Sequence, residues 1–353
     1  MGEKVLLGFS GGMDSCAAAG ILRDEGYDVT LAFLDMLGHA ETTGKARQAA
    51  SSLGLPLRVI DVREAFEREV VAYFADGYAK GETPAPCSRC NPAIKWKYLY
   101  ETAVASGFER IATGHYFRIG HDSAGRCFVR RAADRNKDQS YYLWGVPQHC
   151  LRMAVAPLGD RIKSELRDEL PEELHARESM GVCFLKGRPY GDFLRERLPG
   201  IRPGEIVDRQ GRRVGTHEGY VFYTIGQKRG LGRTVSGPVV AIDAAVNRIV
   251  TGTPDDLWHR TLYVRETYVP APERLKNSDT LRIMIRGIGR NPQGRAEIHP
   301  EGNGTARIEL DDPAWAPAPG QPVVFYDGDT VVGGGILDRT DGHTDRRPEY
   351  GKR

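Results

Sequence analysis

Residues Val5–Leu22 read V-L-L-G-F-S-G-G-M-D-S-C-A-A-A-G-I-L. An apolar run leads into the Gly-rich stretch Ser10–Ser15, and an Ala-rich run beginning at Cys16 follows it. This order predicts a strand, a tight turn and a helix. The two adjacent glycines let backbone N–H groups approach a ligand closely, and the first turn of a helix adds unpaired N–H donors. We therefore expect an anion-binding loop, in which Asp14 serves as a helix cap or in a metal-assisted site.

Strand and helix patterns alternate through the first 115 residues, which predicts a doubly wound parallel sheet. In such sheets nucleotides bind at the carboxyl ends of the strands, so this location favours a nucleotide site over an ordinary capped turn. The loop is not a Walker A motif, because no G-K-[ST] follows it. The predicted strands are Val5–Phe9, Val29–Leu34, Leu57–Val62 and Arg110–Thr113, the predicted helices are Cys16–Glu25, Lys45–Leu53, Arg63–Lys80 and Ile94–Ser106, and Thr83–Pro92 is expected to be a loop.

The pattern changes after residue 116 to hairpins and short strands. We expect a hairpin of Phe117–Ile119 with Cys127–Arg131, a short aromatic segment at Tyr141–Trp144 and a helix at Lys163–Leu174. The six evenly spaced strands after Thr261 predict a small barrel or sandwich, and the polar stretch Asp338–Arg353 is expected to fray. The predicted strands are Gly204–Val207, Tyr220–Thr224, Val239–Asp243 and Arg248–Thr251, then Leu262–Tyr268, Thr280–Arg286, Gly294–His299, Gly304–Leu310, Pro322–Asp327 and Val331–Leu337.

These patterns divide the chain into an α/β domain (1–198), a small central domain (199–260), a C-terminal β-barrel (261–340) and a tail (341–353). Hydrophobic residues make up 40% and charged residues 27% of the 353, which is typical of soluble globular proteins. No run of 18 apolar residues occurs, and a strand that starts at Val5 leaves no room for a signal peptide. We therefore expect a cytoplasmic protein whose six cysteines are reduced.

Three of the cysteines are candidates for chemistry. Cys87 and Cys90 form C-S-R-C, and Cys183 lies in S-M-G-V-C-F. A zinc site is not expected, because no second C-x-x-C or pair of histidines completes four ligands. Sulfur transfer through a persulfide and an iron–sulfur cluster with one open iron both remain possible. The other three cysteines lie in apolar surroundings and are predicted to be packing residues: Cys16, Cys127 and Cys150.

A resemblance to known families rests on several blocks taken together. The loop S-G-G-M-D-S resembles the PP-loop of the ATP pyrophosphatase superfamily. The whole set, in this order, resembles the tRNA-specific 2-thiouridylases and covers Val5 to about Leu337. The further blocks are N-P-A-I-K-W after Cys90, I-A-T-G-H-Y (Ile111–Tyr116), N-K-D-Q-S-Y-Y-L (Asn136–Leu143), S-M-G-V-C-F (Ser179–Phe184), G-T-H-E-G (Gly215–Gly219), Y-T-I-G-Q-K-R-G-L-G (Tyr223–Gly232) and G-G-G-I after Val332.

The resemblance implies ATP-dependent 2-thiolation of the wobble uridine of tRNA, with Mg²⁺ bound beside the phosphates. Cys90 matches the catalytic nucleophile and Cys183 the persulfide carrier, which a cysteine desulfurase or a sulfur-relay protein would charge. Gly8, Phe9, Ser10, Gly11, Gly12, Met13, Asp14, Ser15, Leu34 and Gly114 match ATP-binding positions. Ala85, Pro86 and Cys87 match contacts to the target base, and further tRNA contacts match His115, Lys137, Asp138, Gln139, Arg286, Gly287 and Gln321.

The chain departs from the family at two places. Cys87 stands where the family usually has Asp, so the acid or base role of that residue does not carry over. With Cys90 and Cys183 it makes a trio that resembles related tRNA-thiolating enzymes, in which three cysteines hold a [4Fe–4S] cluster. We weigh cluster and persulfide about evenly, with a slight preference for the cluster. The segment Asp35–Thr43 is also shorter than is usual in the family.

Two alternative functions were weighed against tRNA thiolation. A PP-loop synthetase or amidotransferase for a small molecule would need neither thiol, and an RNA-binding module would not need Asp14. His115 alone would be interpreted as a satisfied residue at a strand end. The net charge of +2 does not by itself indicate nucleic acid. Grouped basic residues still fit an RNA backbone: Arg126, Arg130, Arg131, Arg135 and Lys137, then Arg282, Arg286, Arg290 and Arg295.

Overall fold

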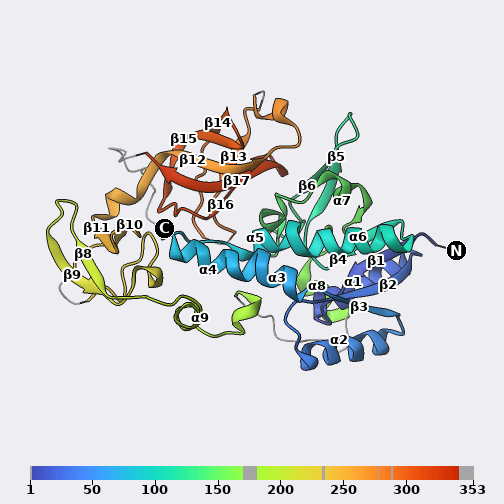
Figure 1. Ribbon diagram of the computed structural model, residues 1–353. Helices are drawn as coiled ribbons and strands as arrows, with labels where there is room; N and C mark the ends of the chain where they lie inside the picture. The colour runs from blue at the N-terminus through green and yellow to red at the C-terminus, as the bar shows by residue number, and fades with distance from the viewer. Residues whose placement is uncertain (1, 170–180, 233–234, 277, 288, 342–353) are drawn as a thin grey trace. The chain divides into compact units, whose positions relative to one another are not determined.

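The computed structural model describes residues 2–169, 181–232, 235–276, 278–287 and 289–341 (Figure 1). Its contacts divide the chain into two compact units, and neither is one continuous stretch. The first unit comprises Met1–Val71, Pro86–Met180 and Asp329–Val332. The second comprises Ala72–Ala85, Gly181–Gly328 and Gly333–Arg353. The chain therefore leaves the first unit within a helical stretch and returns to it just before Cys87.

The first unit is built on a parallel sheet in the order β3-β2-β1-β4-β7. Val5 and Leu7 pack with helices α1 and α2 on one face of the sheet. Gly8 faces the other side, where an added Cβ would lie 2.9 Å from Leu99 of helix α6. Helices therefore cover both faces, as the strand–helix alternation predicts (Figure 1). The strands are β1 (Lys4–Gly8), β2 (Asp28–Asp35), β3 (Leu57–Asp61), β4 (Arg110–Thr113) and β7 (Ala154–Val155).

The other elements of this unit are the helices that cover the sheet, a hairpin and a short turn. The helices are α1 (Met13–Asp24), α2 (Ala40–Leu53), α3 (Arg63–Phe66) with the π-helical turn η1 (Glu67–Val71), α5 (Pro86–Cys90) with the π-helical turn η2 (Asn91–Trp96), α6 (Lys97–Ser106), α7 (Gln148–Met153) and α8 (Lys163–Glu169). A hairpin of β5 (Arg118–His121) with β6 (Cys127–Arg130) and the 3₁₀ turn η3 (Ser140–Leu143) complete it. The hairpin is confirmed where the sequence predicts it.

The second unit contains an aromatic cluster and two sheets. The cluster includes Phe74, Tyr78 and Leu194 and is formed by α4 (Ala72–Ala79), η5 (Cys183–Leu185), α9 (Tyr190–Arg197) and η6 (Tyr220–Phe222). One sheet has the order β10-β11-β8-β9, from β8 (Gly204–Val207), β9 (Arg213–His217), β10 (Val239–Asp243) and β11 (Arg248–Thr251). The short turn η7 (Pro254–Leu257) leads into the second sheet.

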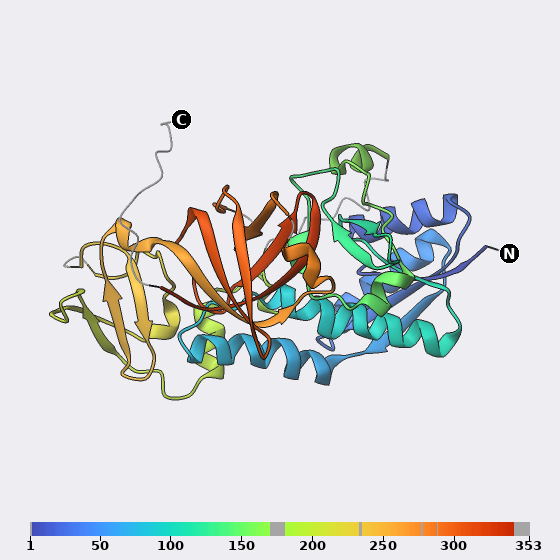
Figure 2. The ribbon, with the colours of Figure 1, turned by 90° about the horizontal axis from the view of Figure 1, so that it is seen from above.

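The second sheet carries the order β13-β16-β17-β12-β15-β14 and appears in orange and red in Figure 2. Its central strand β12 pairs antiparallel with both β15 and β17. Buried and more exposed side chains alternate along β13 and the first half of β15, as the period of two requires, whereas β16 and most of β17 are buried on both faces. The strands are β12 (Trp258–Tyr268), β13 (Leu281–Met284), β14 (Ala296–Gly302), β15 (Thr305–Trp315), β16 (Pro322–Asp327) and β17 (Thr330–Thr340), and η8 (Pro272–Leu275) follows β12.

The predicted loop Thr83–Pro92 is wrong over its second half. Pro86–Cys90 is a helix that continues through Asn91–Trp96 into α6. Pro86 suits a first helical position, where its missing N–H costs nothing. Pro92 cannot donate an i→i−4 bond, and the helix widens around it instead of ending. A proline-rich composition therefore misled the prediction.

The predicted strand Tyr220–Thr224 is also wrong, because Tyr220–Phe222 forms a 3₁₀ turn. Three consecutive side chains there pack against the same aromatic cluster, and a strand would send the middle one to the opposite face. The predicted fraying from Asp338 is wrong as far as Thr340, since Thr340 and Arg339 still pair with β12. Helix α2 begins at Ala40, earlier than predicted. The end of the helix predicted for Lys163–Leu174, residues 179–180 and the tail 342–353 lie outside the described residues.

Candidate active site

The loop between β1 and α1 has the backbone geometry of an anion cradle. Gly11 adopts φ +77°, and an added Cβ there would lie 3.1 Å from Cα of Ala46 in α2. Gly12 is the N-cap of α1, and no side chain caps the amide groups of this helix end. A glycine at position 11 is therefore required both by conformation and by space. The uncapped helix N-terminus leaves N–H donors for a phosphate.

Serines on either side of the glycines close the loop. Buried Ser15 donates its hydroxyl to the Gly12 carbonyl at 2.8 Å, and its Oγ accepts from the Ser10 N–H at 3.3 Å. The exposed Ser10 has its Oγ 3.3 Å from that of Ser15 and accepts from the Gly12 N–H. Ser15 therefore holds the shape of the loop, whereas the Ser10 hydroxyl lies on its solvent side.

Asp14 lies in the first turn of α1 and does not cap it, so the helix-cap alternative is wrong. One carboxylate oxygen accepts from the Tyr116 hydroxyl at 3.0 Å, and the other accepts from the Lys163 ammonium at 2.8 Å. Lys163 is only 8% exposed, and Asp134 accepts from its backbone N–H. A buried cation therefore stands directly beside the predicted phosphate loop. No motif of the sequence marks Lys163, because it lies 149 positions from Asp14.

The end of β4 lies against the same loop. A Cβ on Gly114 would be 3.0 Å from the backbone nitrogen of Ser15, so only glycine lets the two segments approach this closely. Half-buried Leu34 is close to the carboxyl end of β2, Gly8 ends β1 and Phe9 follows it. The structure thus brings the predicted nucleotide-binding residues together at neighbouring strand ends, with β1 between β2 and β4. A strand with crossovers to both sides is where open α/β sheets bind ligands.

His115 lies two residues beyond the end of β4, and its Nδ1 lies 2.9 Å from the Thr113 hydroxyl. Burial, with a smaller contribution from the charge of Lys95, holds the pKa of His115 well below 6.5. The imidazole is therefore neutral at physiological pH. Lys95 belongs to η2, the π-helical turn after Cys90, so the helical stretch that carries the C-x-x-C motif also reaches this strand end.

Cys87 and Cys90 lie three residues apart on α5, a spacing that places both thiols on one face of a helix. Cys87 is exposed and Cys90 is 5% exposed. The Asn91 amide fixes this helix by donating to the carbonyls of Cys87 and Tyr142, both at 3.1 Å. Two buried polar atoms beside the thiols, Ser88 Oγ and Asn91 Oδ1, have no hydrogen-bond partner within the described part of the chain. Such atoms suit a polar ligand.

Two further residues define the surroundings of this helix. Burial raises the pKa of Tyr142, and the charge of a nearby Cys87 thiolate adds to the rise. Tyr142 therefore lies close to Cys87, a placement that the sequence analysis did not single out. Arg89 donates to Glu69 at 2.9 Å, so its charge is paired with a carboxylate.

The predicted tRNA-contacting block Lys137–Gln139 makes internal bonds. The Asp138 carboxylate accepts from the N–H groups of Ala132 and Ser140 and from the Ser140 hydroxyl. Gln139 accepts from the Tyr116 N–H at 2.9 Å. Both side chains therefore hold the loop beside Tyr116, whose hydroxyl in turn reaches Asp14.

In the second unit, Cys183 is exposed and opens a 3₁₀ turn. The next residue, Phe184, packs edge-on against Phe74 with the ring centroids 5.3 Å apart. Ala85 also belongs to this unit, whereas Pro86, Cys87 and Cys90 belong to the first, so the cysteine trio is divided between the units. The other three cysteines are packing residues as predicted, because burial raises the pKa of Cys127, that of Cys16 to about 11 and that of Cys150 to about 12.

The predicted barrel contacts lie around Trp315. The Arg286 guanidinium donates to the carbonyl of Trp315 at 2.9 Å and to that of Ala316. Gly287 follows it directly, half-buried. Asn291 accepts from the Arg286 N–H at 3.0 Å, and the Gln321 side chain accepts from the Ala318 N–H. Arg286 and Gly287 follow β13 and Gln321 directly precedes β16, so these residues lie in two connections of the second sheet. None of the described helices is both long enough and apolar enough to cross a membrane.

The fold and the loop place the chain among the α/β proteins that bind a nucleotide at the carboxyl edge of a parallel sheet. Family models agree with this architecture over most of the length. A tRNA methyl transferase HUP domain matches residues 3–187, a tRNA methyl transferase PRC-barrel domain matches 191–253, and an aminomethyltransferase β-barrel domain matches 260–337. The predicted fold class, an α/β domain followed by a small domain and a β-barrel, is confirmed.

Curated relatives identify the family. The chain is 40% identical to the tRNA-specific 2-thiouridylase MnmA of Moorella thermoacetica, over 94% of this chain and 99% of the relative. It is 35% identical to the tRNA-specific 2-thiouridylase MnmA of Acetivibrio thermocellus, over 95% and 99%. The chain belongs to the tRNA-specific 2-thiouridylase family. A solved structure, of a predicted subunit of tRNA methyltransferase from Methanocaldococcus jannaschii, shares 19% identity over 47% of this chain and 74% of that chain, with a TM-score of 0.32.

Proposed function

We propose that this protein catalyses the ATP-dependent 2-thiolation of the wobble uridine of tRNA. The observation that carries the proposal is the convergence of two groups on the end of β4. The nucleotide loop reaches this strand end where Gly114 lies against Ser15. The thiol helix, which is α5 with its continuation η2 (residues 86–96), reaches the same strand end, because the charge of Lys95 helps to lower the pKa of His115. An activating phosphate and an attacking sulfur need such closeness, since the phosphate is joined to the oxygen of the same carbon atom that the sulfur attacks.

The proposed chemistry begins with activation of a poor leaving group. The uridine 2-oxygen attacks the α-phosphorus of ATP, and pyrophosphate leaves. A sulfur nucleophile then attacks C2, and AMP departs with the original oxygen. Loop N–H groups, the α1 N-terminus and Lys163 would offset the charge of the phosphates. The half-exposed Asp14 carboxylate fits Mg²⁺, which would neutralise phosphate charge when bound.

The sulfur source has two forms. In the persulfide form, the terminal sulfur on Cys183 attacks C2, and the Cys90 thiolate then attacks the inner sulfur. The thiouridine is released with a Cys90–Cys183 disulfide, which a thiol reductant must reopen. In the cluster form, Cys87, Cys90 and Cys183 would hold a [4Fe–4S] group that supplies bound sulfide. The shared face of Cys87 and Cys90 fits two of its ligands.

The remaining assignments follow from the same proposal. ATP would occupy Gly8–Ser15, Leu34 and Gly114, and the target base would meet Ala85, Pro86 and Cys87, with Ser88 and Asn91 as polar neighbours. Further tRNA contacts would come from His115, Lys137, Asp138, Gln139, Arg286, Gly287 and Gln321. A desulfurase or relay protein would donate sulfur in the cytoplasm. Domain boundaries near residues 198, 260 and 340 are part of the proposal.

The test is thiolation of a tRNA transcript by anaerobically purified protein, with iron and sulfide measured on the same sample. We expect ATP-dependent sulfur incorporation, seen as retardation on a mercury-affinity gel. A transcript with cytidine at the wobble position is the control, and equal thiolation of both would contradict the assignment. Absence of iron, together with activity that requires a desulfurase, would reject the cluster form. The small-molecule synthetase alternative predicts no sulfur in tRNA, and the curated relatives do not support it.

A further inference from the structure

The five residues Gly81–Ala85 lead directly into the thiol helix and are fastened to the sheets of the second unit. The Thr83 N–H donates to the Pro319 carbonyl at 2.7 Å. The Thr83 hydroxyl lies 2.6 Å from that of Thr224. Gly320 adopts φ +88°, and an added Cβ there would lie 2.8 Å from Cβ of Glu82. This segment is therefore packed against the β-strands and their connections, although the next residue, Pro86, starts a helix of the other unit.

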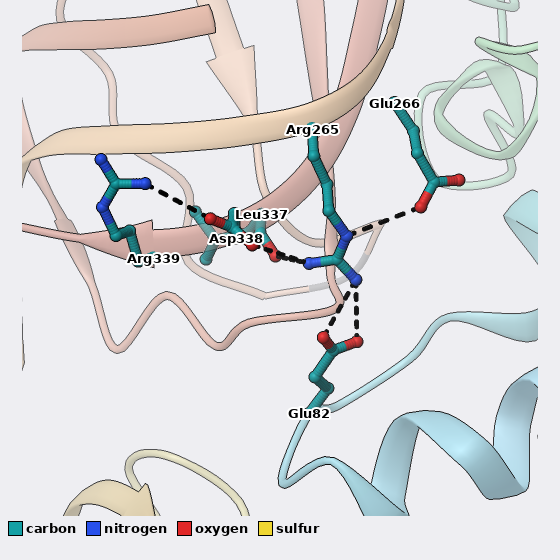
Figure 3. A network of polar contacts seen from close by, with 6 residues as sticks. All are labelled: Glu82, Arg265, Glu266, Leu337, Asp338 and Arg339. Carbon is teal, nitrogen blue, oxygen red and sulfur yellow. Dashed lines mark hydrogen bonds and ion pairs between the residues drawn. The ribbon is translucent and has the colours of Figure 1, made fainter. Parts of the chain in front are cut away.

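An ion pair completes this attachment (Figure 3). Both carboxylate oxygens of Glu82 accept from Nη2 of Arg265 on β12, each at 3.0 Å. Nη1 of Arg265 donates to Asp338 at 3.2 Å, and Nε lies 3.5 Å from Glu266. The side chains of Arg265 and Glu82 are 27% and 16% exposed. Glu82 is thus the one partner of this guanidinium in Figure 3 that comes from outside the β-sheet.

The local backbone of β12 is irregular at this residue. The pairing of β12 with β17 shifts register between Arg265 and Tyr268, and Glu266 adopts φ +52°. Gly335 of β17 makes room, because a Cβ there would lie 3.0 Å from the Arg265 carbonyl. Bulges re-aim side chains near functional sites, and a left-handed backbone is strained for a non-glycine residue such as Glu266. A half-buried ion pair is weak support for stability. Holding Glu82 and its segment in place is therefore a better explanation for the ion pair and the bulge than a gain in stability.

We infer that Glu82 and Arg265 form a positioning pair, which sets the segment entering the thiol helix against the β-barrel that receives the tRNA. This inference rests on the proposed function. Neither residue touches the reacting atoms. Their pairing instead fixes the end of this segment, where Ala85 precedes Pro86 and Cys87, the residues proposed to meet the target base.

The test compares Glu82→Gln and Arg265→Gln with Arg274→Gln. Arg274 of η8 and Asp327 of β16 form a matched pair at 2.8 Å, with 29% and 21% exposure and no part in the segment. We expect kcat for thiolation to fall about 10–100-fold in both test variants, with the Kd for tRNA changed less than about twofold. Arg274→Gln should keep wild-type kcat. Arg265→Lys, which retains a cation for Glu82, should recover much of the loss.

Two results separate positioning from other roles. The double variant Glu82→Gln/Arg265→Gln should be no slower than either single variant, because both remove one interaction. A multiplied loss, or weakened tRNA binding in Arg265→Gln alone, would overturn the inference in favour of direct contact with RNA. Amide hydrogen exchange over residues 81–90 should speed up in the test variants and not in Arg274→Gln; unchanged exchange would also overturn it. If wild-type protein thiolates no tRNA, the proposed function fails, and hydrogen exchange still decides whether the pair holds the segment.

Discussion

Lys163→Met is the most informative single substitution, because it removes a buried cation and retains most of the volume of the side chain. The Lys163 ammonium lies 2.8 Å from Asp14, and the Asp14 side chain is 34% exposed. A hydrogen bond to a charged group contributes about 1.5–3 kcal/mol, and the partial exposure of Asp14 argues for the lower value. We expect a loss of about 1.5 kcal/mol, or a Tm lower by about 3–6 °C.

The same substitution should weaken ATP binding by more than it destabilises the fold. If Lys163 contributes about 2 kcal/mol to phosphate binding, the Kd for ATP rises about 30-fold. ATP at about 100 times its Kd stabilises the wild type by about 2.7 kcal/mol, and the same concentration would stabilise the variant by about 0.9 kcal/mol. Thermal unfolding with and without ATP, and calorimetric titration, measure both quantities.

The matched control is Lys45→Met, which breaks a pair of similar length on the surface. Lys45 and Glu41 are 2.7 Å apart, with 72% and 81% exposure. Exposed pairs of this kind contribute about 0.3–0.5 kcal/mol, so Tm should barely change. Equal stabilisation by ATP in Lys163→Met and wild type would refute the role in phosphate binding. A Tm as high as that of Lys45→Met would refute the argument from burial.

Three further predictions concern the thiols, the half-buried His115 and the close-packed Gly114. Cys90→Ser and Cys183→Ser should each abolish thiolation, whereas tRNA-dependent release of pyrophosphate from ATP is retained; thiolation by either variant contradicts both sulfur routes. Burial and the charge of Lys95 hold the pKa of His115 well below 6.5, so between the two pKa values the unfolded chain binds a proton that the folded chain does not. The free energy of unfolding therefore falls as pH drops below about 6.5. Urea midpoints between pH 7.5 and 5 should fall less in His115→Gln, and an unchanged slope would count against the assignment. Gly114→Ala places a Cβ 3.0 Å from the Ser15 backbone and should cost about 1–3 kcal/mol and weaken ATP binding. Gly44→Ala, whose Cβ meets nothing within 4 Å in helix α2, should be neutral or stabilising by up to about 1 kcal/mol in the same unfolding assay.

Errors in the sequence prediction fall where packing outweighs local preference. Prolines at positions 84, 86 and 92 indicate a loop, yet the chain is helical from Pro86 because one proline starts the helix and another widens it. Tyr220–Phe222 has the apolar character of a strand, yet all three side chains contact one cluster and the backbone turns to allow it. Neither outcome follows from propensity, since each depends on what surrounds the segment.

Local sequence was sufficient for the nucleotide loop and for the order of the domains. A strand, two glycines and a helix start lie within 20 residues, and φ, hydrogen bonding and helix capping act over that range, so the shape of Ser10–Ser15 follows from its own residues. Tertiary structure alone decided what surrounds the loop. Lys163 reaches Asp14 from 149 positions away, and Arg265 reaches Glu82 from 183 positions away. An ion pair forms wherever folding brings two opposite charges together, so the sequence around one partner does not indicate the other.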